Sequence, residues 1–281
     1  MAEITAAQVA QLREMTNAGM MDCKRALTEA QGDMQKAVEI LRKKGAATAA
    51  HKAAREAREG IIVQHVLPGA RAGILVEVNC ETDFVARNEM FRAFATEVAA
   101  RLAADPNADL EALRQDAVGR IRENIKITRH VRLEVAGHGL VAAYIHTGAK
   151  IGVLVEVGAE RPETVATDAF KDLVRDITLQ IAAASPLAVT RADVPPAVLA
   201  KEDEINRQSD RLKGKPPQAM EKILAGMREK FYQTYCLVDQ AFVKNPDQTV
   251  AQHVAEVARQ LGDTITVRRF VRYQVGEAVA A

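Results

Sequence analysis

The chain contains the stretch Gly60-Ile-Ile-Val-Gln-His-Val-Leu-Pro-Gly-Ala-Arg-Ala-Gly-Ile-Leu-Val-Glu-Val78 and, 79 residues later, the similar stretch Gly139-Leu-Val-Ala-Ala-Tyr-Ile-His-Thr-Gly-Ala-Lys-Ile-Gly-Val-Leu-Val-Glu-Val157. In each stretch, two runs rich in Val, Ile and Leu flank a turn that contains glycine, which is typical of a β-hairpin. An amphipathic helical pattern follows each hairpin, beginning at Phe91 in the first copy and at Phe170 in the second. The repeat therefore predicts two related structural units.

A third strand closes each unit. The run Ile125-Lys-Ile-Thr-Arg-His-Val-Arg-Leu133 resembles Ile265-Thr-Val-Arg-Arg-Phe-Val-Arg-Tyr273, 140 residues later. Each unit then has the order strand, strand, helix, strand, which predicts an antiparallel three-stranded sheet with one face covered. The expected fold class is α+β, with a duplicated antiparallel ββαβ core. We assign residues 60–137 to the first core subdomain, and residues 138–184 with 262–281 to the second.

The second unit is longer because it carries an insertion at residues 185–261. Within it, Val198, Ile205 and Leu212 recur every seven residues, and a break at Gly214-Lys-Pro-Pro217 follows. A second apolar stripe comes after the break, at Met220, Leu224, Met227 and Phe231. The spacing predicts an antiparallel coiled-coil hairpin of two helices. The alternative is an ordinary helical pair packed on the core.

Residues 1–44 predict a module of three short helices. Thr5 and Gln8 fit a capping box, Gly19 ends the first helix, and Asp33 caps the third. Residues 45–59 follow as a run rich in Ala, Lys and Arg that is polar on nearly all sides. This composition predicts an exposed helical linker.

Composition limits the function classes. Apolar residues make up 48% of the 281 residues, so a large core can form, while 38 Lys and Arg against 37 Asp and Glu give no basic excess for a dedicated nucleic-acid binder. The three cysteines lack the spacing of a disulfide framework or a zinc site, which favours a reducing compartment. Residues Met1 to Thr5 show no secretory or transit pattern, and no run reaches the roughly 18 apolar residues of a membrane span. We expect a cytoplasmic protein.

Motifs of catalysis are missing from the sequence. It contains no GxxxxGK[ST] phosphate loop, no GxGxxG fingerprint, no HExxH helix and no GxSxG turn. We therefore predict no catalytic residue, no bound metal, no cofactor and no enzymatic activity. An enzyme whose Cys and His meet only in the folded chain is one alternative. An RNA- or ribosome-binding module is another, based on Arg129, Arg132, Arg268, Arg269 and Arg272 in the closing strands, although a solvated face explains these charges more simply.

The run Val78-Asn-Cys-Glu-Thr-Asp-Phe-Val-Ala-Arg-Asn88 connects the first hairpin to its helix. Thr82 and Asn88 are both candidate N-caps, so a helix between them has only one or two turns. Such a short element places Phe84 at the tip of the unit, where a phenylalanine beside Asp83 suits insertion into a partner. The alternative is that Phe84 folds back under its own sheet, and spacing alone favours that alternative.

This run resembles the TDFVA[KR]N signature of the elongation factor Ts family, and Gly19-Met-Met-Asp-Cys-Lys24 resembles its N-terminal signature. The resemblance spans nearly the whole chain, as far as Val275-Gly-Glu277. It implies a guanine-nucleotide exchange factor that binds elongation factor Tu with GDP. Such a factor promotes GDP release by disturbing the Mg²⁺ and phosphate site, which allows GTP to load during translation elongation. The resemblance implies no direct contact with nucleic acid or membrane.

The resemblance also implies which residues touch the partner. Four would form a tip that wedges beside the Mg²⁺ site of the GTPase domain: Thr82, Asp83, Phe84 and Val85. His146, in the second hairpin turn, would reach the C-terminal barrel domain of the GTPase. The N-terminal module resembles a ubiquitin-associated fold and would dock on a GTPase helix through Leu12, Met20 and Met21. Ile125 would lie on the same face. The alternative for Met20 and Met21 is a place in the core of the module.

Overall fold

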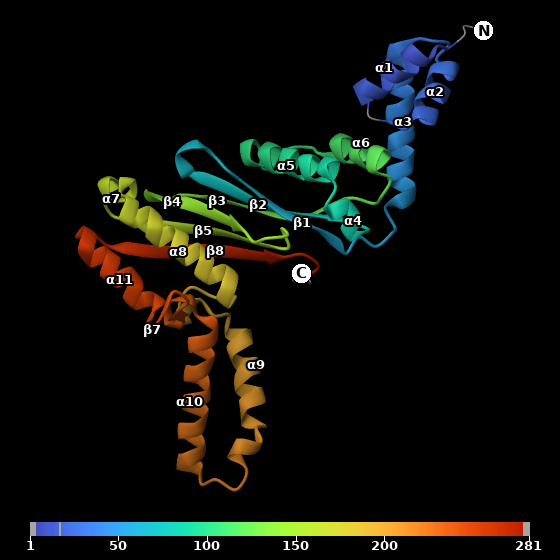
Figure 1. Ribbon diagram of the computed structural model, residues 1–281. Helices are drawn as coiled ribbons and strands as arrows, with labels where there is room; N and C mark the ends of the chain where they lie inside the picture. Colours follow the sequence, from blue (N-terminus) through green and yellow to red (C-terminus); the bar gives the residue numbers. More distant parts are fainter. Residues whose placement is uncertain (1–3, 17, 278–281) are drawn as a thin grey trace.

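The computed structural model describes residues 4–16 and 18–277 (Figure 1). Parts of two predicted segments, residues 1–3, 17 and 278–281, lie outside the described residues. The fold is mixed α/β with two three-stranded antiparallel sheets. The first sheet has the order β1-β2-β3, formed by Glu59–Val66, Ala72–Cys80 and Lys126–Glu134. The second has the order β4-β5-β8, formed by His138–Ile145, Ile151–Ala159 and Ile265–Gln274.

The two sheets share their register as well as their strand order. Val78 of β2 pairs with Ile127 of β3, and the equivalent Val157 of β5 pairs with Val267 of β8. Each sheet also shifts register immediately before these pairs, after a glutamate in the central strand. A bulge at the same position in both sheets bends both closing strands in the same way.

The sheets pack face to face and helices cover their outer faces (Figure 1). Ile62 and Leu75 of the first sheet lie in one buried cluster with Val141 and Leu154 of the second. This contact needs a glycine in β5, because a Cβ on Gly152 would lie 2.4 Å from Cγ2 of Ile62. The expectation that only one face of each sheet is covered is therefore wrong. Continuous apolar central strands are typical of sheets that are buried on both faces.

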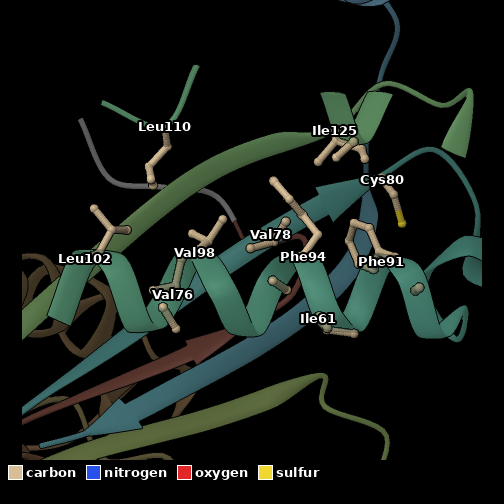
Figure 2. Packing of buried hydrophobic residues seen from close by; sticks show 14 of the residues in the cluster. Ile61, Val76, Val78, Cys80, Phe91, Phe94, Val98, Leu102, Leu110 and Ile125 are labelled. Carbon is tan, nitrogen blue, oxygen red and sulfur yellow. The ribbon is translucent and has the colours of Figure 1, made fainter. Parts of the chain in front are cut away.

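Helices α5 (Glu89–Ala104) and α8 (Asp168–Ala184) form the outer layers. Figure 2 shows Phe91 and Phe94 of α5 packed against the strands, near Ile61 and Val78. On the other side, α8 and α11 (Val250–Leu261) pack against the second sheet through a separate cluster. Among the residues that the structure describes, no helix is long and apolar enough to cross a membrane.

A buried carboxylate in each central strand connects the two sheets. Glu156 of β5 is 1% exposed and accepts hydrogen bonds from Arg269 Nε at 2.7 Å and Arg268 Nη1 at 3.0 Å. It also accepts from the backbone N–H of Ala136 at 3.1 Å, just after the closing strand of the first sheet. Burial acts to raise the pKa of Glu156, but these three donors outweigh it and hold that pKa below its ordinary value.

The first sheet has the reciprocal arrangement. Glu77 of β2, also 1% exposed, accepts from Arg129 Nε at 2.7 Å and from the backbone N–H of Gly276 at 3.1 Å, just after the closing strand of the second sheet. Each glutamate therefore holds the chain that leaves the other sheet. Arg129 and Arg268 are only partly exposed, and Arg269, although exposed, still pairs with the buried Glu156. These three arginines therefore have partners within the protein.

Replacing the carboxylate of Glu156 tests this arrangement. We expect Glu156→Gln to lower the free energy of unfolding by about 2 kcal/mol at pH 7, because charge-assisted hydrogen bonds to a buried group are lost. Since the folded pKa is lowered, the contribution of Glu156 is present above about pH 4.5 and disappears as pH falls through the folded pKa. Urea unfolding at pH 7 and pH 3 measures both effects. An equal loss at both pH values would contradict this role.

The N-terminal module consists of α1 (Ala6–Thr16), α2 (Met20–Glu29) and the first half of α3 (Met34–Lys52), around a core of its own. The predicted caps are confirmed. Thr5 and Gln8 exchange hydrogen bonds of 3.0 and 3.2 Å, and the Asp33 carboxylate accepts from the N–H of Lys36 at 3.0 Å. The three helices are therefore fixed by local sequence as well as by packing.

The segment after residue 44 is helical as far as Lys52, but it is not exposed on all sides. Helix α3 continues through Gly45 to Lys52, and both Gly45 and Ala49 are buried. The reason is a close contact with α6 (Glu111–Ile121), where a Cβ on Gly119 would lie 3.1 Å from Cα of Gly45. Two glycines opposite each other allow the two helices to approach, which composition alone did not reveal.

The insertion forms a hairpin of α9 (Pro196–Arg207) and α10 (Pro217–Tyr235) that projects away from the sheets (Figure 1). The predicted seam is wrong for Val198 and Ile205, which are exposed. Helix α9 instead contacts α10 through Leu199, in a cluster with Phe231, and through an ion pair of Asp203 with Arg228. The remaining elements are α4 (Asp83–Ala86), α7 (Pro162–Ala166), β6 (Ala241–Phe242), β7 (Asn245–Thr249) and the 3₁₀ turns at Pro68–Ala70, Arg191–Asp193, Asp210–Leu212 and Leu237–Asp239.

Candidate partner-binding site

The tip predicted between the first hairpin and its helix is present. The hydroxyl of Thr82 accepts a hydrogen bond from the N–H of Val85 at 3.3 Å, and the side chain of Asn88 accepts from the N–H of Met90 at 2.8 Å. Both N-caps are confirmed, and α4 between them has four residues. The side chain of Phe84 is 81% exposed. The alternative in which Phe84 folds under its own sheet is therefore excluded.

The other tip residues connect Phe84 to the core. Asp83 is partly buried and forms an ion pair with Arg87 at 2.9 Å. Val85 packs against the core cluster under α5, and the next residue, Ala86, is buried in it. The tip thus has an apolar base and presents one aromatic ring and one carboxylate at its surface.

Glu123, in the loop between α6 and β3, holds the base of the tip. Its carboxylate accepts hydrogen bonds from the backbone N–H groups of Glu81 at 2.9 Å and Thr82 at 3.0 Å, and from the hydroxyl of Thr82 at 2.6 Å. A four-residue helix is too short to be stable alone, so these contacts help to keep it folded. Sequence reasoning missed Glu123 because it lies in a loop some 41 residues away and follows no periodic pattern.

The cysteine next to the tip is not a nucleophile. Burial raises the pKa of the Cys80 thiol to about 12, and the charge of Glu123 adds to this effect. Burial likewise raises the pKa of Cys236 to about 11. Both thiols are neutral at pH 7, and a neutral buried thiol is unreactive. In residues 4–16 and 18–277, no group of His, Cys, Asp and Glu side chains could hold a metal ion.

The N-terminal module presents two methionines at its surface. Met20 and Met21 begin α2 and are 59% and 64% exposed, so the alternative of a place in the core is excluded. Leu12, in contrast, is fully buried in the core of the module. The expectation of a direct contact by Leu12 is therefore wrong, because this residue lies on the inward side of α1 with Val9.

Ile125 and His146 differ in their exposure to solvent. Ile125 precedes β3 and is fully buried in the cluster with Phe91 and Phe94 (Figure 2), so it is not available for direct contact and that expectation is wrong too. His146 lies in the turn between β4 and β5 and is exposed. Its Nδ1 is 3.0 Å from the hydroxyl of Tyr144, which orients the imidazole ring.

Comparison with known proteins decides the family. The family model described as Elongation factor TS matches residues 81–277, which is more than half of the chain. The chain belongs to the elongation factor Ts family. Elongation factor Ts from Symbiobacterium thermophilum is 47% identical, covering 99% of this chain and 94% of the relative. Those from Chloroherpeton thalassium and Trichlorobacter lovleyi are 44% and 42% identical, with coverage of 99% and 98% of this chain and 100% and 94% of the relative.

Membership of the elongation factor Ts family makes this chain a factor of translation elongation. The exposed tip lies at the start of the region that the family model matches, whereas Met20 and Met21 lie before it. The full-length relatives nevertheless cover the N-terminal module as well.

Two phenylalanines, the exposed Phe84 and the buried Phe91, allow an exposed ring to be compared with a core ring. We expect Phe84→Ala to change the free energy of unfolding by less than about 0.5 kcal/mol, because the exposed ring makes few contacts. Phe91→Ala removes a fully buried ring and should cost about 3–5 kcal/mol. Chemical denaturation measures both values. A large loss of stability in Phe84→Ala would mean that this ring belongs to the core.

Proposed function

We propose that this chain is a guanine-nucleotide exchange factor that binds elongation factor Tu with GDP and promotes GDP release, so that GTP can load. Family membership supports the partner, and the exposed ring of Phe84 beside Asp83 supports the site. The chain acts by contact and needs no catalytic residue. The three cysteines, all free and buried, suit action in the reducing cytoplasm.

The proposed mechanism is displacement of the partner's Mg²⁺. Phe84 inserts into the GTPase domain as an apolar anchor, while the carboxylate of Asp83 perturbs the surroundings of the ion. Mg²⁺ bridges phosphate oxygens and orders the switch loops of GTPases, so its displacement weakens nucleotide binding. By linkage, the factor and GDP weaken each other's binding equally. About 1.4 kcal/mol of distortion loosens GDP roughly tenfold.

Three separate surfaces take part in the proposed complex: the methionines of the N-terminal module, the tip with Phe84 and the turn with His146. Met20 and Met21 dock the N-terminal module, which resembles a ubiquitin-associated fold, on a helix of the GTPase domain. His146 contacts the C-terminal barrel domain. Leu12 and Ile125 act indirectly, since they pack beneath the first surface and beneath the tip. Several separate contacts on one partner raise the overall affinity above that of any single contact.

We also infer how the chain is divided. The matching order, register and bulge of the two sheets support a duplicated ββαβ core, with subdomains at residues 60–137 and at 138–184 with 262–281. Residues 185–261 form the insertion, for which we propose a short coiled-coil hairpin. The N-terminal module covers residues 1–44, and residues 45–59 connect it to the core, with α3 extending to Lys52.

The ring of Phe84 should control the rate of nucleotide release. We expect Phe84→Ala at saturating concentration to slow release of fluorescent GDP from elongation factor Tu by about tenfold or more, because an interface anchor supplies a few kcal/mol. Stopped-flow fluorescence measures this rate. Ile205→Ala is the matched control, because it removes another exposed apolar side chain, on α9. An unchanged release rate in Phe84→Ala would rule out the wedge.

His146 should contribute to affinity rather than to the displacement step. We expect His146→Ala to raise the dissociation constant for elongation factor Tu about fivefold, while the rate of GDP release at saturation changes little. Isothermal titration calorimetry measures the constant. His138→Ala is the control, because His138 is exposed at the start of strand β4, whereas His146 follows the end of that strand. Equal affinities of both variants and the wild type would remove His146 from the interface.

A further inference from the structure

Three consecutive residues between α6 and β3 touch three distant parts of the chain. The first, Arg122, reaches the N-terminal module, where its guanidinium lies 2.5 Å from the carboxylate of Asp22. Asp22 directly follows the exposed Met20 and Met21 in α2. The hydrogen bond from Lys44, with those from Arg25 and the charge of Arg122, holds the pKa of the Asp22 carboxyl below its usual range. The ion pair is therefore present at neutral pH.

The second residue, Glu123, holds the base of the tip through the three hydrogen bonds to Glu81 and Thr82. The third, Asn124, is fully buried. Its side-chain amide donates to the backbone oxygen of Arg55 at 2.7 Å, in the segment that leaves α3. Its backbone N–H donates to the carboxylate of Glu81 at 2.6 Å. One short segment thus binds the module, its connection and the tip.

The backbone of Arg122 adopts a conformation that is strained for a residue with a side chain, as does that of Ser185 at the end of α8. Arg122 ends α6 in the left-handed region, with φ 66° and ψ 22°. This position favours glycine, because a side chain there is strained. Helix α11 of the same chain ends in nearly the same conformation, φ 61° and ψ 36°, and has Gly262 there. At residue 122 the chain carries an arginine instead, and the guanidinium reaches across to another module.

We propose that Arg122–Asn124 is a positioning segment that fixes the methionine surface of the module relative to the Asp83–Phe84 tip, so that one partner engages both at once. This inference rests on the proposed function. A fixed separation matters because orienting two surfaces before binding removes that entropic cost from the complex. If the module turned freely on its connection, the second contact would gain less from the first.

The test uses Arg122→Gly, which removes the guanidinium and suits the left-handed backbone. A merely structural arginine would lower the thermal stability when removed, whereas this variant should melt at the same temperature as the wild type or higher. The positioning role predicts that the concentration of factor giving half-maximal GDP release rises about threefold to fivefold, as expected from the loss of an exposed ion pair. The release rate at saturation should change less. Arg25→Ala is the control, because it removes a partner of the same Asp22 but within α2.

A distance measurement tests positioning without the partner. Spin labels on the exposed positions Glu29→Cys of α2 and Thr96→Cys of α5 report the separation of module and core by double electron–electron resonance. We expect one narrow distance distribution with Arg122 present and a broader one in Arg122→Gly, in which the contact of α3 with α6 still holds the base of the module. Unchanged distances, or an unchanged half-maximal concentration, would overturn the proposal. If Phe84→Ala also leaves the rate of GDP release unchanged, the proposed function itself fails. If Phe84→Ala slows GDP release while Arg122→Gly behaves like the wild type, only the positioning role of Arg122–Asn124 is ruled out.

Discussion

The two buried carboxylates, Glu77 and Glu156, set the geometry on which the other elements depend. Each holds an arginine of its own closing strand and the N–H group of the chain that leaves the opposite sheet. A shift of one sheet against the other would break these bonds and leave charge buried without a partner, which is costly. The sheets therefore have one relative position. The tip after β2 and the turn that carries His146 then keep a constant relation to each other.

This rigid platform supports the action that we propose for the chain on another protein. The proposed wedge needs a rigid support, and Phe84 lies on a four-residue helix that is capped, packed against α5 and held by Glu123. In the proposed mechanism, strain is transferred to the partner, whose nucleotide site depends on a bound ion. The GTPase would then respond to binding by losing affinity for GDP.

Much of this arrangement could be predicted from the sequence, and the remainder has a common physical cause. The repeat predicted strand order, and the caps at Thr82 and Asn88 predicted the short helix, because both signals are local. Leu12 and Val198 show the limit: periodicity gives the spacing of a stripe but not which surface covers it. The contacts of Gly45 with α6 and of Glu123 with the tip join residues far apart in the chain, and no local pattern reports them.

We propose that the tip acts through the partner's Mg²⁺. The most direct measurement compares the acceleration of GDP release from elongation factor Tu by this chain in the presence of Mg²⁺ and after its chelation. If the factor works by displacing the ion, the acceleration of GDP release is large with Mg²⁺ present. It is clearly smaller after chelation, because the ion has then already been removed. An acceleration of the same size under both conditions would show that the tip does not act through the ion.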